Sequence, residues 1–111
     1  MTPRPDSLGS HEQLVLLALA RLPRNAYGVT IRHEIHERSG KDVSLGAIYP
    51  TLDRLQKKGF VRSYLSEPRG ERGGRSRRLY ELTPAGAAAL ISARQQLSSM
   101  WLGLRLRVKE T

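Results

Sequence analysis

The chain has 111 residues, which is one domain's worth and leaves little room for a second hydrophobic core. Lysine and arginine number 19 against 10 acidic residues, and a formal charge of +9 on so small a body favours a polyanionic partner, nucleic acid first. The chain contains no cysteine, which excludes disulfides, thiolate metal sites and a cysteine redox switch.

The first residues are expected to form an arm followed by a helix. Residues 1–9 are polar and rich in proline, as in a flexible arm. Ser10, followed three positions later by Gln13, fits a capping box that begins a first helix, and Pro23 ends it. The apolar run at residues 14–20 is far too short to cross a bilayer, so we expect no membrane contact and a cytoplasmic protein.

A second helix is predicted within residues 25–40. Tyr27, Ile31 and Ile35 fall on one helical face, and Gly40 is a natural C-terminal stop. This gives a short amphipathic helix separated from the first by a tight connection.

Histidines in this second helix raise the question of a metal site. His33 and His36 lie one turn apart, but two ligands on an exposed helix bind a metal weakly, and His11 is distant in sequence. The chain also shows no set of nucleophile, base and orienting residue and no phosphate-cradling loop. We therefore predict no metal, no other cofactor and no enzymatic activity.

A third helix is predicted from its cap at Ser44 to its stop at Gly59, with Ile48, Leu52 and Leu55 turned toward the core. Residues on its outward face are unusual for a helix start. In a helix interior, glycine costs about 1 kcal/mol and proline about 3 kcal/mol relative to alanine.

A helix that reads a DNA groove presses its first turns against bases and phosphates, which favours residues with little side chain, such as Gly46 and Pro50. Hydroxyl groups on this face can bind phosphates, Arg54 can reach phosphate or guanine, and small apolar side chains can meet thymine methyl groups. The candidate contacts are Ser44, Gly46, Ala47, Tyr49, Pro50, Thr51 and Arg54. Two alternatives stay open: Gly46 and Pro50 serve helix packing and a bend, and Tyr49 is a half-buried core aromatic.

A change of period then predicts a β-hairpin. The stretches "FVRSYLS" and "RLYELT" alternate and are rich in strand formers, and "EPRGERGGRSR" between them predicts a positively charged tip. Arginine favours the minor groove, where the negative potential is strongest. The alternative is a solvated loop that binds nothing.

Thr83 and Pro84 are expected to begin a last helix, as its cap and its first residue, that runs to about residue 110. An apolar stripe repeats along it at helical spacing. The stripe consists of Leu90, Leu97, Trp101, Leu104 and Val108, with Met100 at its border. A second copy is the natural partner for this stripe, and the alternative is packing against its own domain. Trp101 either anchors that interface or stacks on a flat apolar effector.

Three helices followed by a hairpin is the order of a winged helix-turn-helix, so the expected fold is mainly α with a small β-hairpin. We expect a flexible arm at residues 1–9, a DNA-binding domain at residues 10–83 and a C-terminal dimerisation helix at residues 84–111.

Two stretches, "LGAIYPTLDRLQKKGFV" and "GGRSRRLYELTPAG", resemble the PadR family of transcriptional regulators. "AYGVTIRHEI" is similar to the family's second helix, which usually carries Gly-Tyr where this chain has Tyr27-Gly28, and the resemblance covers about residues 12–90. It implies a dimeric winged-helix protein, usually a repressor, on a palindromic operator, with a single C-terminal helix that pairs with its counterpart and with the first helix. The DNA-contacting positions that it implies are Tyr49, Thr51, Arg54, Gly74, Arg75 and Arg77.

The expected function is therefore sequence-specific binding of double-stranded DNA by a homodimeric transcriptional repressor, with release by a small apolar effector as a further option. Two other readings stay open: a winged-helix module that binds an acidic protein, and a nonspecific architectural DNA binder.

Overall fold

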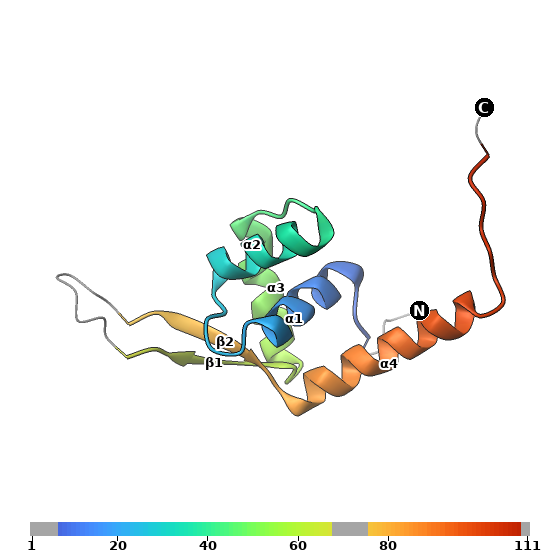
Figure 1. The fold of residues 1–111 in the computed structure, drawn as a ribbon. Coiled ribbons are helices and arrows are strands. Elements are labelled where there is room, and N and C mark those ends of the chain that lie inside the picture. Colours follow the sequence, from blue (N-terminus) through green and yellow to red (C-terminus); the bar gives the residue numbers. More distant parts are fainter. Residues whose placement is uncertain (1–6, 68–75, 110–111) are drawn as a thin grey trace.

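The computed structural model describes residues 7–67 and 76–109, so the predicted DNA contacts Gly74 and Arg75 lie outside the described residues. The fold is mainly α with a two-stranded antiparallel hairpin, as predicted (Figure 1). In chain order the elements are α1 (Ser10–Arg21), α2 (Gly28–Ser39), α3 (Leu45–Lys57), β1 (Val61–Leu65), β2 (Arg78–Leu82) and α4 (Pro84–Trp101).

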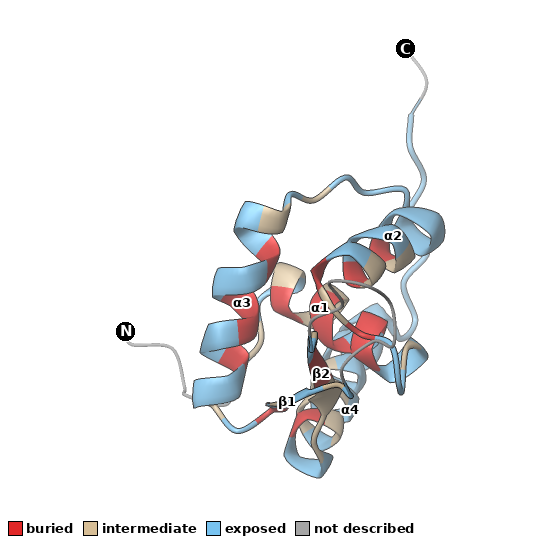
Figure 2. Ribbon diagram, turned by 90° about the vertical axis from the view of Figure 1, so that its left-hand side faces the viewer, coloured by how far each residue is buried: buried red, intermediate tan, exposed pale blue. Residues whose placement is uncertain are grey.

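The core lies between the first three helices and the start of the hairpin. Ile48, Leu52 and Leu55 of α3 are completely buried, as their spacing predicted, and they pack with apolar residues of α1 and α2. Figure 2 shows the result: one face of α3 is buried against the body and the opposite face is exposed. Burial of this one face fixes which residues α3 presents outward.

The start of α1 corrects the sequence prediction. Gly9, and not Ser10, is the N-cap, and the Glu12 carboxylate accepts the Gly9 backbone N–H at 3.0 Å, so Ser10 and Gln13 do not form the box. Leu8 packs against the core. Residues 7–9 are thus part of the folded domain and not of a flexible arm, because a carboxylate is the stronger acceptor for an orphan N–H and glycine is tolerated at a cap.

The predicted ends of α2 and α3 are confirmed. Gly40 and Gly59 follow the two helices with φ of 72° and 82°, a left-handed conformation that favours glycine. Ser44 caps α3, and its side-chain oxygen accepts the N–H of Ala47 at 3.1 Å. These stops and caps set the short connection between α2 and α3 that a helix-turn-helix requires.

The hairpin is attached to the helical body through β2. β1 and β2 pair with Val61 opposite Leu82 and Leu65 opposite Arg78. On its other side, β2 donates the Tyr80 backbone N–H to the carbonyl of Ala26, at 2.9 Å, in the connection between α1 and α2. β2 therefore has backbone partners on both of its edges.

α4 begins where the sequence predicts: Thr83 accepts the N–H of Gly86 at 3.1 Å, and Pro84 is the first helical residue. Gly86 lies so close to the Phe60 backbone carbonyl that a Cβ there would overlap with it. From this contact α4 runs past the helical body, and its second half extends away from it (Figure 1).

The end of α4 differs from the prediction. The helix stops at Trp101, because Gly103 adopts φ 81° and the Leu104 N–H turns back to the Trp101 carbonyl at 2.9 Å. Leu104 and Val108 are therefore not part of a helical stripe. The strict alternation of apolar and basic residues from 104 to 109 is a period of two, which indicates an extended segment.

Within the described ranges, no helix has both the length and the apolar character needed to cross a membrane.

Candidate nucleic-acid interface

The outward start of α3 is built from residues with little side chain. Gly46, Ala47 and Pro50 are all exposed there, beside the exposed cap Ser44. A Cβ added to Gly46 would meet only the Ser44 side-chain oxygen, at an ordinary contact distance of 3.7 Å. Packing inside the protein therefore gives no reason for a glycine at this position, and the alternative that Gly46 permits close helix packing is wrong.

Packing inside the protein gives no reason for a proline at position 50 either. It lies inside α3 and is exposed, and it carries no backbone N–H to donate to the carbonyl of Gly46 four residues earlier. The helix continues through it to Lys57. The first two turns of α3 thus give up helix stability and leave a low, open surface on which a ligand's atoms can come close to the backbone.

Tyr49 lies at the edge of this surface and is 41% exposed. One side of its ring packs against Gly28 at the start of α2, where a Cβ would come within 2.6 Å of the ring carbon Cζ. Tyr49 thus packs on α2 with one side and is exposed on the other, and its contact with DNA stays a prediction.

Thr51 corrects the predicted set of contacts. It is only 1% exposed, and its hydroxyl donates to the Ala47 carbonyl at 2.8 Å, which is the common use of a threonine inside a helix. The same oxygen accepts the Arg54 Nη2 at 3.0 Å. Because it is buried, Thr51 does not reach a ligand on the outer surface; it orients Arg54 instead.

Arg54 is half exposed and lies between two partners. Its Nη2 donates to Thr51, and its Nε is 4.0 Å from Oε2 of Glu12, a carboxylate that is almost fully covered. Lys58 contacts the same carboxylate at 3.1 Å and the Ser7 carbonyl at 3.0 Å. Glu12 thus offsets part of the positive charge at this end of α3.

The charge state of Glu12 follows from these contacts. Burial raises the pKa of the Glu12 carboxyl, but the Gly9 N–H, the Lys58 ammonium and the Arg54 guanidinium together outweigh burial and hold the pKa below its ordinary value. Glu12 is therefore ionised at neutral pH and holds α1, α3 and the residues before α1 together.

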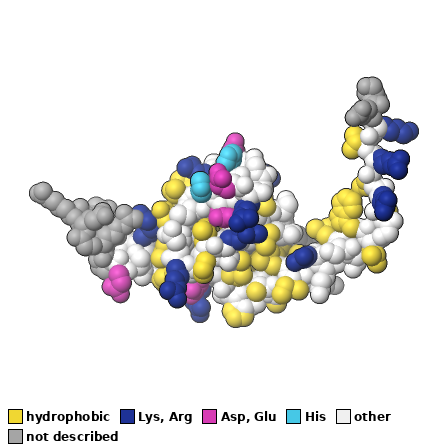
Figure 3. All heavy atoms as spheres, viewed as in Figure 1, with side chains coloured by type: hydrophobic (Ala, Val, Ile, Leu, Met, Phe, Trp, Pro, Cys, Tyr) yellow, Lys and Arg dark blue, Asp and Glu magenta, His cyan; other side chains and the backbone are white. Residues whose placement is uncertain are grey.

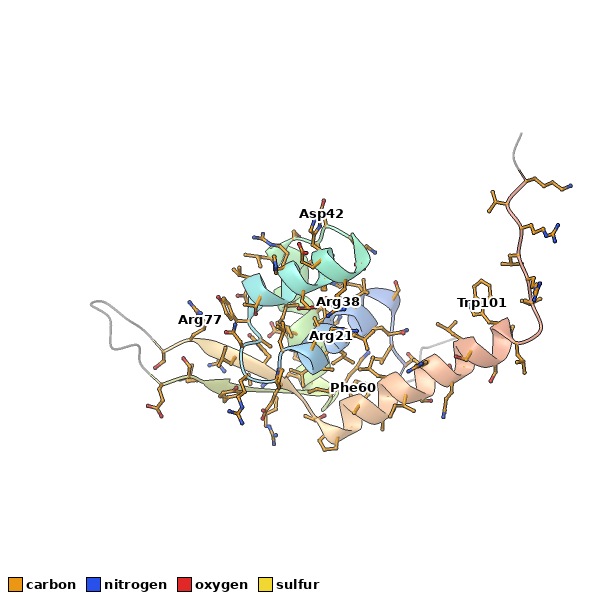
Figure 4. The ribbon with its side chains drawn as sticks, viewed as in Figure 1. Arg21, Arg38, Asp42, Phe60, Arg77 and Trp101 are labelled. Carbon is orange, nitrogen blue, oxygen red and sulfur yellow. The ribbon has the colours of Figure 1, made fainter. Side chains whose placement is uncertain are left out.

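Just before β2, at the tip end of the two strands, Arg77 is the described member of the predicted wing contacts. Its guanidinium carbon lies 4.0 Å from the centre of the Tyr27 ring, and its backbone N–H donates to the Ser66 side chain at 2.8 Å. Figure 4 shows Arg77 at the end of β2 that borders the tip of the hairpin. The neutral Tyr27 ring thus lies against this charge, and within residues 7–67 and 76–109 no carboxylate pairs with Arg77.

Two other arginines of the hairpin have polar partners on the neighbouring strand. Arg62 pairs with Glu81 at 2.6 Å between Nε and Oε1, and Arg78 donates to the Ser63 hydroxyl at 3.0 Å. Neither Arg62 nor Arg78 was among the predicted DNA contacts, and the cross-strand partners of both depend on the register of the hairpin.

Tyr80 joins the hairpin to α3 from the buried side. Burial raises the pKa of its phenol; nearby Arg78 opposes the rise, and Tyr49 and Asp53 add to it. Tyr80 is therefore neutral at physiological pH and serves as a packing residue under the candidate surface.

The predicted dimerisation residues divide into three groups, of which Leu104 and Val108 lie exposed beyond the end of α4. Leu90 is half-buried against its own domain, so it is not part of a free stripe. Leu97, Met100 and Trp101 are exposed in the second half of α4, with Met100 74% and Trp101 56% exposed. Figure 3 shows hydrophobic side chains along α4 and the adjoining part of the body. Ile91 and Leu102, which the sequence prediction left out, are exposed apolar residues as well.

A groove of about 710 Å³ runs between the start of α1 and α4. Small side chains of α4 line one wall, Leu8 and Gln13 line the other, and Phe60 and Leu97 also border it. Small residues allow the backbone of another helix to approach closely, and Leu97 belongs both to this groove and to the exposed end of α4.

The histidines of α2 do not come together as a metal site. His36 Nδ1 lies 2.8 Å from Asp42, and no group of three or more His, Asp or Glu side chains that could hold a metal occurs within residues 7–67 and 76–109.

Comparison with known proteins gives concordant matches. Residues 15–92 match the family described as "Transcriptional regulator PadR-like family". The "Transcriptional regulator Rv3488" of Mycobacterium tuberculosis (strain ATCC 25618 / H37Rv) is 42% identical over 74 residues, which are 67% of this chain and 64% of that protein. The chain thus spans less than two thirds of this relative's length.

Solved structures agree on the fold. A PadR family transcription regulator from hypervirulent Clostridium difficile R20291 superposes with a TM-score of 0.68 at 28% identity, covering 83% of this chain and 91% of that one. F93 from STIV, a winged-helix DNA-binding protein, superposes with a TM-score of 0.67 over 86% of this chain and 95% of that one. At 19% identity this second likeness concerns the fold alone.

Proposed function

The chain belongs to the PadR-like family of transcriptional regulators, which are not enzymes, and from this premise we propose that it is a homodimeric repressor that binds a palindromic operator in double-stranded DNA. It would act in the cytoplasm and use α3 and the hairpin together, α3 in the major groove and the hairpin beside it.

One observation carries this proposal: the exposed start of α3 contains a glycine and a proline that nothing inside the protein requires. Gly46 has open space where a Cβ would lie, and Pro50 removes an N–H from the middle of the helix. Both residues lower helix stability, and both make sense if a duplex must come within contact distance of the α3 backbone.

Charge supports the same function. The chain carries a formal charge of +9, and Arg54 and the exposed Lys57 lie on α3 while Arg77 and Arg78 lie on the hairpin. Cations distributed over two elements can bind phosphates on both sides of a groove, and each phosphate that is neutralised releases condensed counterions. Binding should therefore weaken steeply as salt is added.

The apolar surface of α4 supports a dimer. Leu97, Met100 and Trp101 are exposed on a part of α4 that extends beyond its own domain, next to the groove beside α1. We propose that the α4 of a second copy occupies this groove, so that a two-fold axis relates the two reading helices. Such symmetry would place the helices about 34 Å apart in successive major grooves.

Trp101 has two roles to be distinguished. It is half exposed at the end of α4 and points away from the helix (Figure 4). We propose that it anchors the dimer interface. Release of DNA by a flat apolar effector stacked on Trp101 is the second option, and quenching of its fluorescence by such a compound, together with loss of DNA binding, would favour it.

The decisive experiment is a gel-shift titration against the DNA upstream of the protein's own gene, with a scrambled duplex of the same composition as the control. We expect tighter binding to the natural sequence and a steep loss of binding with salt. Equal affinity for both duplexes would indicate an architectural binder. No binding to either duplex at low salt, together with binding to an acidic protein, would indicate an interaction module.

A further inference from the structure

The start of α2 contacts both elements that are proposed to touch DNA. The Tyr27 ring, at the N-cap of α2, lies under the Arg77 guanidinium at 4.0 Å, and Gly28, the first helical residue, lies under the ring of Tyr49. Figure 1 shows how this is possible: the first turn of α2 lies next to the hairpin, and α3 lies behind it. Two neighbouring residues thus meet the hairpin on one side and the reading helix on the other.

The backbone around Tyr27 is fixed by hydrogen bonds. The preceding carbonyl, of Ala26, accepts the Tyr80 N–H of β2 at 2.9 Å. The N–H of Tyr27 donates to the Thr30 hydroxyl at 3.0 Å, and its carbonyl accepts the Ile31 N–H at 2.9 Å. The ring therefore projects from a backbone that is tied both to α2 and to the hairpin strand.

Gly28 is a glycine because of close approach and not because of backbone conformation. Among the described residues, only Gly40, Gly59 and Gly103 have a positive φ, so the backbone of Gly28 does not require a glycine. A Cβ at this position would overlap with the Tyr49 hydroxyl and would come within 2.6 Å of Cζ and 2.9 Å of Cε2. Any larger residue would therefore require the Tyr49 ring to move.

The partner of Arg77 matters for its charge. Arg62, on the same hairpin, is paired with Glu81 at 2.6 Å and has its charge offset by that carboxylate. The Tyr27 ring is neutral, so it restrains the long Arg77 side chain without offsetting its charge. A side chain that is already ordered loses less conformational freedom when it binds a phosphate.

We propose that Tyr27 and Gly28 are positioning residues for DNA binding, which hold Arg77 of the hairpin and Tyr49 of α3 at a fixed separation. The inference rests on the proposed function, because it assigns these two residues to the same DNA-binding surface. Neither residue needs to touch DNA: Tyr27 acts through Arg77, and Gly28 acts through Tyr49.

The test of Tyr27 is a double-mutant cycle read by operator affinity. Tyr27→Leu should weaken binding roughly two- to fivefold when Arg77 is present, which is the range expected for loss of a cation–π contact. In the Arg77→Ala background it should cause no further loss. Tyr27→Phe, which keeps the ring, should bind as the wild type does. Equal weakening by Tyr27→Leu in both backgrounds, or an equal loss with Tyr27→Phe, would overturn the proposal.

A second measurement needs no DNA. In the free protein, NMR should place the Arg77 side-chain protons upfield, because they lie over the Tyr27 ring, and Tyr27→Leu should return them to ordinary positions. If the wild type shows no preference for its upstream DNA, the proposed function fails and the positioning role fails with it, while these shifts still report the contact. If the wild type prefers its upstream DNA but the Arg77 side-chain protons have ordinary chemical shifts, the positioning role alone is wrong.

Gly28 is tested by operator affinity and by stability: Gly28→Ala should weaken operator binding when Tyr49 is present and cause no further loss of affinity in the Tyr49→Ala background. Gly28→Ala should lower the melting temperature in the presence of Tyr49, and the loss should largely disappear in the Tyr49→Ala background, where the collision is removed. A loss of the same size in both backgrounds would show that Gly28 does not serve Tyr49.

Discussion

Lys58 Nζ lies 3.1 Å from Oε2 of Glu12, which joins the residue after α3 to the first turn of α1 across 46 positions of sequence. The same carboxylate accepts the N–H of Gly9, the cap of α1. Together with the Arg54 guanidinium at 4.0 Å, these partners tie Glu12 to the cap of α1 and to the end of α3, and the charge of one carboxylate stabilises the junction between the two helices.

This junction should be sensitive to acid. The pKa of Glu12 is lowered on folding from about 4.5, so ionised Glu12 contributes stability above that pH, and the contribution is lost as pH falls through the lower folded pKa. Glu12→Gln should lower the free energy of unfolding at pH 7 by about 1–3 kcal/mol, and it should reduce the difference in stability between pH 7 and pH 3. Denaturant melts at both pH values measure this.

The matched control for Glu12 is Glu34→Gln. Glu34 pairs with Arg38 one turn away on α2, where Arg38 is well exposed, and such pairs contribute only about 0.3–0.5 kcal/mol. If the two variants lost the same stability, the Glu12 junction would have no special role.

Gly46→Ala should change stability and DNA binding in opposite directions. The added Cβ has free space, and an exposed glycine in a helix costs up to about 1 kcal/mol relative to alanine, so the free protein should melt at a higher temperature. The same methyl group would lie between the α3 backbone and the duplex, and operator affinity should fall. Gly40→Ala, at φ 72°, serves as the control that destabilises. A Gly46→Ala protein that binds as tightly as the wild type would contradict close approach at this position.

The exposed end of α4 should determine the oligomeric state. Leu97→Asp should convert the dimer to a monomer in sedimentation velocity experiments, because it places a charge in the apolar surface beside the groove. Trp101 is the only tryptophan, so its emission should move to longer wavelength as the dimer dissociates. Val29→Asp, at an exposed apolar residue of α2, should leave the dimer intact. A wild type that sediments as a monomer would remove the basis for a two-fold operator.

Arg77 and Arg54 should differ in what they contribute to binding. Arg77→Ala should weaken binding to all sequences alike and should lower the slope of log affinity against log salt by about 0.9 if it contacts one phosphate. Arg54, which Thr51 orients on α3, should affect the preference among sites, so Arg54→Ala should narrow the difference between operator and scrambled DNA. Identical salt slopes and site preferences for the two variants would show that affinity for phosphates and preference among sites are not separated between the hairpin and α3.

The parts of the fold that depend on local patterns were predictable. The spacing of Ile48, Leu52 and Leu55 identified the buried face of α3, and Thr83 with Pro84 identified the start of α4. At the other end of α4, spacing misled: leucines that continue a helical stripe also fit an alternating extended segment, and Gly103 ends the helix. The glycine and the alternation after it were the signals that favoured the second interpretation.

Parts of the site that depend on tertiary contacts were not predictable. Thr51 stands at the boundary between the two faces of α3, and only the packing of the helix shows that it is buried. Nothing in the sequence around Gly28 indicates its close contact with Tyr49, because Tyr49 belongs to another helix. The same holds for Glu12: Ser10 with Gln13 fits a capping box equally well as a pattern, and the contact with Lys58 needs the folded chain.

β2 is bonded to β1 along one edge and to the Ala26 carbonyl along the other, so described residues anchor the hairpin strand on both sides. The sequence between the two strands can therefore be exchanged as a unit. Grafting a different sequence between Ser66 and Arg77 would leave the ladder, the Tyr80 bond and the Tyr27 contact in place. New preferences for DNA could therefore be selected by changing this segment alone, without redesigning the domain that carries the hairpin.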